Sequence, residues 1–381
     1  MLERLYMELL GKTRDQLREY CLALGEPAYR AAQLYHALYA ERKFEFAGMT
    51  NLPAALREKL AREATITLPS VKQRYVSTDG SVRFLLSLDT QKPASVEAVY
   101  MPSERRQTIC ISTQAGCAVD CQFCLTAQLG LIRNLTAGEI IAQVLLPLNE
   151  VPKKRSASQT AHDSNEATLD ENPGESGDEV QTNVVLMGQG EPLLNFDNVI
   201  AALRILLDEE GVGLSPKRVT LSTSGIIPGI ERLAKEEVRP KLAISLNASC
   251  DEQRDVLMPI NRKYPLKALI DACRKYPLRN WEHITFEYVL LGGVNDSVED
   301  AKRVVKLLAP LKSVKVNLIP WNPGELPYKE SSENRIETFR RILADREIPT
   351  FVRYSRGRDV MAACGQLALL EVKNSPLNVL R

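Results

Sequence analysis

Histidines, long apolar runs and an excess of charge are all scarce in this chain of 381 residues, and each absence excludes a class of protein. Only His36, His162 and His283 occur, and none is near the cysteine-rich stretch, so a mixed Cys/His zinc site there has no local partner. No apolar run approaches the roughly 20 residues of a membrane span, and the first residues lack the features of a signal peptide. The net charge of +1 gives no hint of nucleic acid. We expect a cytoplasmic protein without membrane contact, whose eight cysteines are ligands, catalysts or core residues rather than disulfides.

The first 95 residues predict an accessory domain that is mainly helical. Apolar positions recur at helical spacing over residues 13–63, and Gly25 and Pro27 interrupt them. Two strand-like runs follow, 71–77 and 81–88, separated by a hairpin signal at Thr78-Asp79-Gly80.

From residue 96 to about 350, strand-like and helix-like segments alternate. The alternation predicts a parallel sheet with right-handed crossovers. Six such units favour an α/β fold in the form of an incomplete barrel, a partial (βα)6 relative of the TIM barrel, followed by a C-terminal tail at 351–381. The predicted strands are 108–113, 183–187, 218–223, 241–246, 284–290 and 314–319, and the clearest helices are 137–148, 196–208, 297–311 and 335–345.

One polar stretch, residues 152–181, interrupts the alternation. It is rich in Ser, Glu, Asp and Asn and almost free of large apolar residues, so we expect a disordered insertion. His162 falls inside it, which argues against a catalytic role for that histidine. Without the insertion the chain is mildly basic, which permits an RNA partner without indicating one.

Side-chain alternation within four of the strands predicts where a ligand binds. A strand covered on both sides by helices should be apolar on both faces, yet each of these has one polar face. We therefore predict a barrel whose lumen holds a polar ligand, the alternative being a sheet with one solvated face. The polar faces are Thr108, Cys110 and Ser112; Thr220 and Ser222; Ala243, Ser245 and Asn247; and Thr285, Glu287 and Val289.

Three cysteines, Cys117, Cys121 and Cys124, lie within eight positions after the first barrel strand. Thiolates bind iron–sulfur clusters and zinc, and three of them can hold three irons of a [4Fe-4S] cluster while the fourth iron stays open. The alternatives are a zinc knuckle that lacks its fourth ligand, or chance clustering. The CxxxCxxC spacing with Phe123 before the last cysteine resembles the radical S-adenosylmethionine enzymes, and this resemblance implies that S-adenosyl-L-methionine occupies the open iron.

A second segment, "MGQGEPLLN" at 187–195, supports the same class. Its strand runs into Gly188, Gly190, Glu191 and Pro192, and glycines let the backbone approach a ligand closely. Glu191 could accept hydrogen bonds from the ammonium group of the cofactor.

The chain resembles, from its first helices to its last cysteine, the RlmN-type adenine C2-methyltransferases of 23S rRNA and tRNA. Only the insertion falls outside the resemblance. The matching segments are "VEAVYMP", "TICISTQAGCAVDCQFC", "MGQGEPLLN", "VTLSTSGIIPGI", "LAISLNA", "NLIPWNPG" and "DVMAACGQL".

The resemblance implies a radical route with two S-adenosylmethionine molecules. Cys364 is first methylated, and the radical formed at the cluster then takes hydrogen from that methyl group. The carbon radical adds to C2 of adenine, Glu97 accepts the C2 proton, and Cys110 attacks the sulfur of Cys364 to release the product. The disulfide that remains needs an external reductant. For Cys21, Cys250 and Cys273 we keep the commoner fate of free thiols, a place in the apolar core.

The remaining expectations concern ligands and partners. The partners implied are 23S rRNA, tRNA and an external electron donor such as flavodoxin, with the chain acting as a monomer. Asn247 departs from the family, which often has histidine there, so a side-chain contact is in doubt while a backbone contact would survive. The cofactor contacts carried over are Gly190, Glu191, Ser222, Ser245, Leu246, Asn247 and Asn322. The basic residues expected to hold RNA are Lys72, Arg74, Arg83, Arg105, Arg106, Arg353, Arg356 and Arg358, each of which is alternatively a solvated charge.

Two rival functions remain open. A Cfr-type enzyme would methylate C8 of adenine with the same cysteines, and the segments matching across the accessory domain favour C2. A non-catalytic metal module that binds RNA through a zinc or cluster fold would predict tetrathiolate zinc and no need for Cys364.

Overall fold

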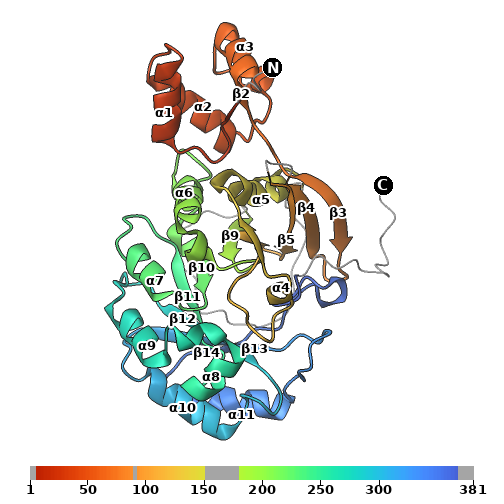
Figure 1. Ribbon diagram of the computed structural model, residues 1–381, viewed down its shortest axis with the longest axis vertical. Coiled ribbons are helices and arrows are strands. Elements are labelled where there is room, and N and C mark those ends of the chain that lie inside the picture. The colour runs from red at the N-terminus through yellow and green to blue at the C-terminus, as the bar shows by residue number, and fades with distance from the viewer. Residues whose placement is uncertain (1–5, 89–91, 151–179, 368–381) are drawn as a thin grey trace, which may run out of the picture.

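The computed structural model describes residues 6–88, 92–150 and 180–367 and has two parts of unequal size (Figure 1). The small part is N-terminal and helical, and the large part is built around one ten-stranded sheet. The insertion expected at 152–181 lies outside the described residues except for its last two positions, and the end of the tail lies outside them too. No described helix is long and apolar enough to cross a membrane.

The N-terminal part packs three helices and a short parallel strand pair. Helix α1 starts with a capping box, in which the Thr13 side chain accepts from the Gln16 N–H and the Gln16 side chain from the Thr13 N–H. This part rests on the larger one through a close backbone contact, since a Cβ on Gly11 would lie 2.2 Å from the nitrogen of Gly138. Its elements are β1 (Met7–Glu8), α1 (Arg14–Ala23), α2 (Tyr29–Tyr39), α3 (Ala54–Glu63) and β2 (Ala64–Thr65).

The six predicted barrel strands are all present and form a continuous parallel run. They are β6 (Arg106–Cys110), β9 (Gln181–Leu186), β10 (Val219–Thr223), β11 (Lys241–Ser245), β12 (Ile284–Leu290) and β13 (Val314–Pro320), adjacent in this order. A seventh parallel strand, β14 (Thr350–Val352), extends the run beyond β13. With only three residues, β14 shows too little alternation to be predicted.

The predicted hairpin forms, but it belongs to the large sheet. Strands β3 (Ser70–Val76) and β4 (Val82–Leu88) are antiparallel, and β4 pairs with β5 (Ala94–Pro102), which pairs in turn with β6. The domain boundary expected at residue 95 therefore falls inside a strand. The hairpin, expected in the accessory domain, instead continues the barrel sheet.

Helices cover the outer face of the parallel strands, and the predicted α/β class with a partial barrel is confirmed (Figure 1). Apolar residues on that face, such as Leu221, Leu242 and Phe286, are fully buried in the main core. The opposite faces of β10, β11 and β12 line a cavity, as their alternation predicts. The helices are α4 (Leu125–Gln128), α5 (Ala137–Glu150), α6 (Phe196–Leu207), α7 (Ile227–Leu233), α8 (Asp251–Leu257), α9 (Leu266–Lys275), α10 (Val298–Leu308) and α11 (Glu333–Ala344).

Candidate active site

A cavity of about 170 Å³ opens at the carboxyl ends of the parallel strands, where α/β folds place their ligand sites. It brings together ten of the thirteen sequence-predicted site residues as lining, nine of them outside the C-terminal segment. These nine are Cys117, Cys121, Cys124, Gly190, Glu191, Ser222, Ser245, Asn247 and Asn322. The wall also contains Cys364 and Gly365 of the C-terminal segment, whereas Cys110, Glu97 and Leu246 lie outside the lining.

The three-cysteine loop is held at its base by a short hairpin, β7 (Gln114–Gly116) with β8 (Leu131–Asn134). The Cys117 N–H donates to the carbonyl of Gly130 at 3.0 Å. Gly116 has φ +74°, and a Cβ there would lie 1.8 Å from that same carbonyl oxygen, so only glycine closes this loop. The loop is thereby fixed with all three cysteines facing the cavity.

The thiols of this loop fit a multinuclear cluster better than a single ion. No group of three or more His, Cys, Asp or Glu side chains in the described part of the chain converges on a single-ion site. A structural zinc needs all its ligands within about 2.3 Å of one centre, whereas each thiolate of a four-iron cluster binds a different iron. Burial raises the pKa of Cys117 to about 12 and raises that of Cys121 well above its usual value, and the charges of Cys124 and Cys117 add to the shift of Cys121. Cations are therefore needed to stabilise these thiolates together.

The Gly190–Glu191 turn is built tightly against the same region. Gly190 has φ +101°, and a Cβ there would lie 2.7 Å from the backbone nitrogen of Gln114. The Glu191 carboxylate accepts from the N–H of Leu193 at 3.1 Å and of Ser224 at 2.7 Å. Burial raises the pKa of Glu191, and these hydrogen bonds oppose the shift. Glu191 thus joins the end of β9 to the end of β10 at the cavity wall.

A partly buried carboxylate, Glu287, is the main lining residue that the predicted site residues do not include. Its side chain accepts from the Ser222 hydroxyl at 3.0 Å, and Ser222 lies 3.4 Å from the Ser245 hydroxyl. Burial raises the pKa of Glu287. Its signal was present in the sequence, because it belongs to the predicted polar face of β12.

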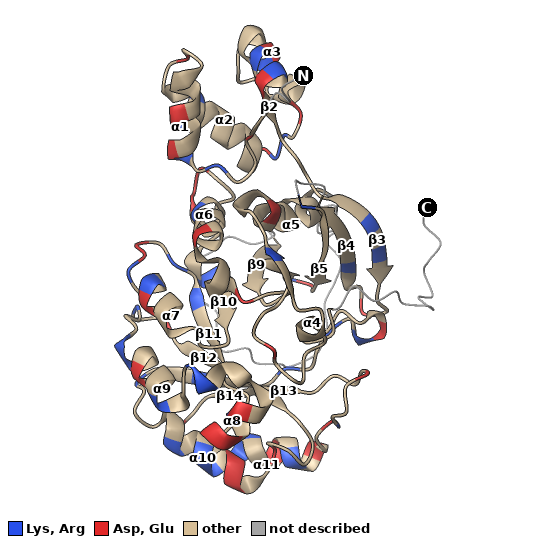
Figure 2. Cartoon of the chain, in the orientation of Figure 1, with Lys and Arg blue, Asp and Glu red and all other residues tan. Residues whose placement is uncertain are grey.

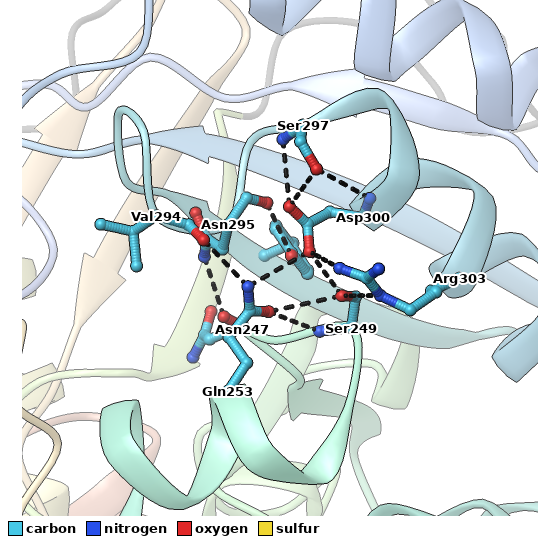
Figure 3. A network of polar contacts seen from close by, with 9 residues as sticks. Asn247, Ser249, Gln253, Val294, Asn295, Ser297, Asp300 and Arg303 are labelled. Atoms are coloured by element: carbon cyan, nitrogen blue, oxygen red, sulfur yellow. Dashed lines mark hydrogen bonds and ion pairs between the residues drawn. The ribbon is translucent and has the colours of Figure 1, made fainter.

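Asn247 has a left-handed backbone, φ +55°, and its side chain is engaged within the protein. Its Oδ1 accepts from the Val289 N–H at 2.8 Å, and its carbonyl accepts from Asn295 Nδ2 at 2.9 Å. Figure 3 shows the polar network in which this residue lies, which also contains Ser249, Asp300 and Arg303. Asn247 is therefore held in place by contacts to β12 and the following loop.

Two cysteines from distant parts of the chain approach this cavity. Cys110 is at the end of β6, packed against Val360, Ala362 and Leu367 of the C-terminal segment. Burial raises its pKa, and the charge of Cys364 raises it further. The Cys364 thiol is exposed to the cavity, and the surrounding walls raise its pKa to about 12.

The segment that bears Cys364 is docked over the cysteine loop. The carbonyl of Gly365 accepts from the Leu125 N–H at 2.8 Å, and that of Leu367 accepts from the Thr126 hydroxyl at 2.6 Å. Asn322 Nδ2 donates to the Cys364 carbonyl at 3.2 Å. Hydrogen bonds therefore fix the Cys364 segment directly to the helix that follows the cysteine loop.

Glu97 and Arg83 form a fully buried ion pair. Glu97 is on β5 two residues before Val99, which pairs with Cys110, so it shares the lumen-side face of the sheet. The Tyr75 ring covers the Arg83 guanidinium, with the cation 4.2 Å from the ring centroid. The prediction that Arg83 contacts RNA backbone is wrong, because its side chain has no exposed surface.

The other predicted RNA-contact residues are mostly exposed. Figure 2 shows basic residues on β3, whereas α10 and α11 carry both signs. Arg356 forms an ion pair with Asp79, and Arg358 forms one with Glu330, so the charges of these two arginines are already paired within the protein. Lys72, Arg74, Arg105, Arg106 and Arg353 are exposed.

A partial parallel barrel with three cysteine thiols at its carboxyl end defines the class: a radical S-adenosylmethionine enzyme. The profile of the radical SAM superfamily matches residues 111–308. That of the ribosomal RNA large subunit methyltransferase N-terminal domain matches residues 7–66.

Relatives extend the similarity over nearly the whole chain. The probable dual-specificity RNA methyltransferase RlmN of Koribacter versatilis is 48% identical, covering 92% of this chain and 98% of its own. The dual-specificity RNA methyltransferase RlmN of Geobacter sulfurreducens is 44% identical, and the alignment covers 95% of this chain and 92% of the relative. The crystal structure of a radical SAM methyltransferase from Sphaerobacter thermophilus superposes with a TM-score of 0.83 at 40% identity, covering 95% of this chain and 99% of that one. The chain belongs to the RlmN family of radical SAM RNA methyltransferases.

Proposed function

We propose that this enzyme methylates C2 of adenosine in 23S rRNA, at the peptidyl-transferase centre, and in tRNA next to the anticodon. Cys117, Cys121 and Cys124 would hold a [4Fe-4S] cluster. When bound, the cluster and S-adenosyl-L-methionine supply the radical that a carbon as unreactive as C2 requires. The cofactor would contact Gly190, Glu191, Ser222, Ser245, Leu246, Asn247 and Asn322.

The observation that carries the proposal is that Cys364 lines the cavity of the cysteine loop while Cys110 packs against the same C-terminal segment. A radical enzyme that acts without a protein-bound methyl carrier would need neither thiol. The two come from the first barrel strand and from the C-terminal segment, and the charge of one raises the pKa of the other. Fixing both beside the reacting atoms provides the proximity that sequential transfers need.

Each residue then has one task. Cys364 carries the methyl group, and its high pKa means that its thiol proton must leave as the methyl group arrives. Glu97 accepts the C2 proton after the carbon has been added. Cys110 attacks the sulfur of Cys364, which breaks the bond to the product, and an external reductant restores the two thiols.

The RNA must present an unstacked base, because the target carbon of a base within a stacked helix cannot reach a cavity inside a barrel. Unstacking costs a few kcal/mol, which phosphate contacts offset. We propose that the N-terminal part and the exposed basic residues of β3 and the β5–β6 turn supply those contacts. In this division, residues 1–95 hold RNA, 96–350 carry out the chemistry and 351–381 supply the methyl carrier. The enzyme would act as a cytoplasmic monomer with an external electron donor such as flavodoxin.

Mass spectrometry of nucleosides tests the regiochemistry. A strain that lacks its own enzyme is complemented with this chain, and the rRNA and tRNA are digested separately. We expect 2-methyladenosine in both pools. Appearance of 8-methyladenosine instead would establish the Cfr-type alternative. A zinc-bound, non-catalytic module would give neither product and would contain no iron or sulfide.

A further inference from the structure

Arg254 on α8 is a fully buried cation for which the structure provides no ion pair. Its side chain has no exposed surface, and no carboxylate in the described part of the chain lies within 4.0 Å of it. Its hydrogen-bond acceptors are all neutral. They are the carbonyls of Leu246 at 3.0 Å, Ser224 at 2.6 Å and Ser245 at 3.1 Å, and Asn261 Oδ1 at 3.1 Å.

The nearby carboxylates on the same helix are directed elsewhere. Asp251 and Asp255 accept from the Asn261 amide at 2.9 and 2.7 Å, so their charges act on Arg254 from beyond hydrogen-bond distance. Burial lowers the pKa of Arg254 to about 10, which still leaves it charged at neutral pH. A buried cation that makes no direct ion pair is unfavourable unless anions lie close to it.

The three-cysteine loop packs against the same helix, α8. The Gln122 N–H, between Cys121 and Cys124, donates to the carbonyl of Leu257 at the end of α8, 3.0 Å away. Phe123 packs in one apolar cluster with Leu257 and Met258. The thiolates of this loop, joined to a cluster whose sulfides are also anionic, therefore lie next to the unpaired guanidinium.

We infer that Arg254 is the electrostatic counter-charge of the iron–sulfur cluster and also fixes the strand ends that bind the cofactor. The inference rests on the proposed function in requiring that the cysteines hold a cluster. Reduction transfers one electron from an external one-electron donor to the cluster and adds one negative charge beside Arg254. The cation favours the reduced form, so it raises the reduction potential.

The second role follows from the acceptors. Ser224 follows β10, and Ser245 and Leu246 end β11, so one guanidinium bridges two adjacent strands at the cavity. Those strands carry Ser222, Ser245, Leu246 and Asn247, four of the proposed cofactor contacts. Arg254 is not among the residues that line the cavity. It would therefore act by positioning the strand ends that contact the cofactor.

Two substitutions separate charge from geometry. Arg254→Gln removes the charge but keeps N–H donors for the carbonyls. Arg254→Lys keeps the charge but loses the planar fork that reaches three carbonyls at once. Asn261→Ala is the matched control, since it removes one neutral partner of Arg254 and leaves both the charge and the carbonyl contacts.

The readout is the potential of the cluster, measured by an anaerobic titration with dithionite and electron paramagnetic resonance. Iron and sulfide are first counted in each protein. We expect Arg254→Gln to lower the ratio of reduced to oxidised cluster at least tenfold at a fixed potential, which is 59 mV for one electron. Arg254→Lys and Asn261→Ala should stay within threefold of the unsubstituted enzyme. Arg254→Lys should bind S-adenosylmethionine at least tenfold more weakly, seen as the change that the cofactor causes in the cluster signal.

Opposite results overturn the inference. An unchanged reduction potential in a cluster-loaded Arg254→Gln protein refutes the counter-charge. If Arg254→Gln fails to fold, a tenfold change in the ratio of reduced to oxidised cluster in Arg254→Lys refutes it as well. Unchanged cofactor binding in Arg254→Lys refutes the positioning role. If the unsubstituted chain takes up no iron and sulfide, the proposed function itself has failed.

Discussion

Asp79 and Asp359 form a reciprocal contact, in which each carboxylate accepts hydrogen bonds from the chain segment that contains the other residue. The carboxylate of Asp79, in the β3–β4 turn, accepts from the Gly357 N–H at 2.9 Å. The carboxylate of Asp359, just beyond Gly357, accepts from the Thr78 N–H at 3.0 Å and from the Ser77 hydroxyl at 2.5 Å. This reciprocal contact anchors the start of the segment that ends at Cys364.

The anchor should weaken in acid. Burial alone would raise the pKa of both carboxyls, but hydrogen bonds from Ser81 and Gly357 hold that of Asp79 at about 2, and those from Ser77 and Thr78 lower that of Asp359. A carboxyl whose pKa is depressed on folding stabilises the fold above its unfolded value near 4 and loses that contribution as the pH falls toward 2. We expect amides of 357–367 to exchange faster in Asp79→Asn than in the unsubstituted enzyme at pH 6.

The difference in exchange between the two proteins should vanish near pH 2, which hydrogen exchange with mass spectrometry measures. Glu337→Gln, an exposed carboxyl paired with Arg340, is the control and should leave this segment unchanged. A difference that persists at pH 2 would contradict the assignment to Asp79.

Removal of Cys110 should trap the reaction before release. In Cys110→Ala, methyl transfer to the base still occurs, but no thiol is placed to attack the sulfur of Cys364. We expect a covalent protein–RNA species to accumulate under turnover, visible as an RNase-sensitive band of low mobility. Cys364→Ala should give neither adduct nor product. Cys250→Ala, which changes a half-buried thiol outside the cavity lining, should turn over normally.

Glu97 can be tested for chemistry apart from its ion pair with Arg83. Glu97→Gln removes the anion from a fully buried pair, which we expect to cost about 3 kcal/mol of unfolding free energy in denaturant titrations. In the double variant Arg83→Met with Glu97→Met, most of that stability should return while methylation stays below a hundredth of normal. Methylation restored together with stability would make Glu97 structural only.

Asn247 should matter more for stability than a polar residue in a loop usually does. Asn247→Ala leaves the buried Val289 N–H without its acceptor and places alanine at φ +55°. We expect a loss of about 2–4 kcal/mol, combining an unsatisfied donor with left-handed strain. Asn247→Gly removes only the acceptor and should lose about 1 kcal/mol less. Equal losses in the two variants would show that the backbone is unstrained.

The sequence predicted well those features that depend on neighbouring residues. The six strands, the polar faces of β10 to β12 and the cysteine loop all follow from spacing within a few positions. Glu287 could have been predicted as a site residue, because it lies on the strand face that was predicted to line the lumen. The short strand β14 lacked enough residues for a pattern to show.

Features that depend on pairing across the fold were not predictable. Arg83 looks like a solvated basic residue, and only its pairing with Glu97 on the adjacent strand explains its burial. Arg254 is one arginine on a short polar helix, and nothing near it in sequence indicates three carbonyl partners on two strands. Strand β5 was missed because the hairpin before it suggested that a domain ends there.

The junction between α5 and β9 offers a practical handle on this enzyme. Glu150 ends α5, Val180 precedes β9, and Gln181 pairs with Arg106 at the first residue of β6. These positions mark the amino end of the strands, whereas the cavity lies at their carboxyl end. A fluorophore attached at Val180 would therefore report on the amino end of the strands, next to the proposed RNA contacts Arg105 and Arg106, and not on the cavity.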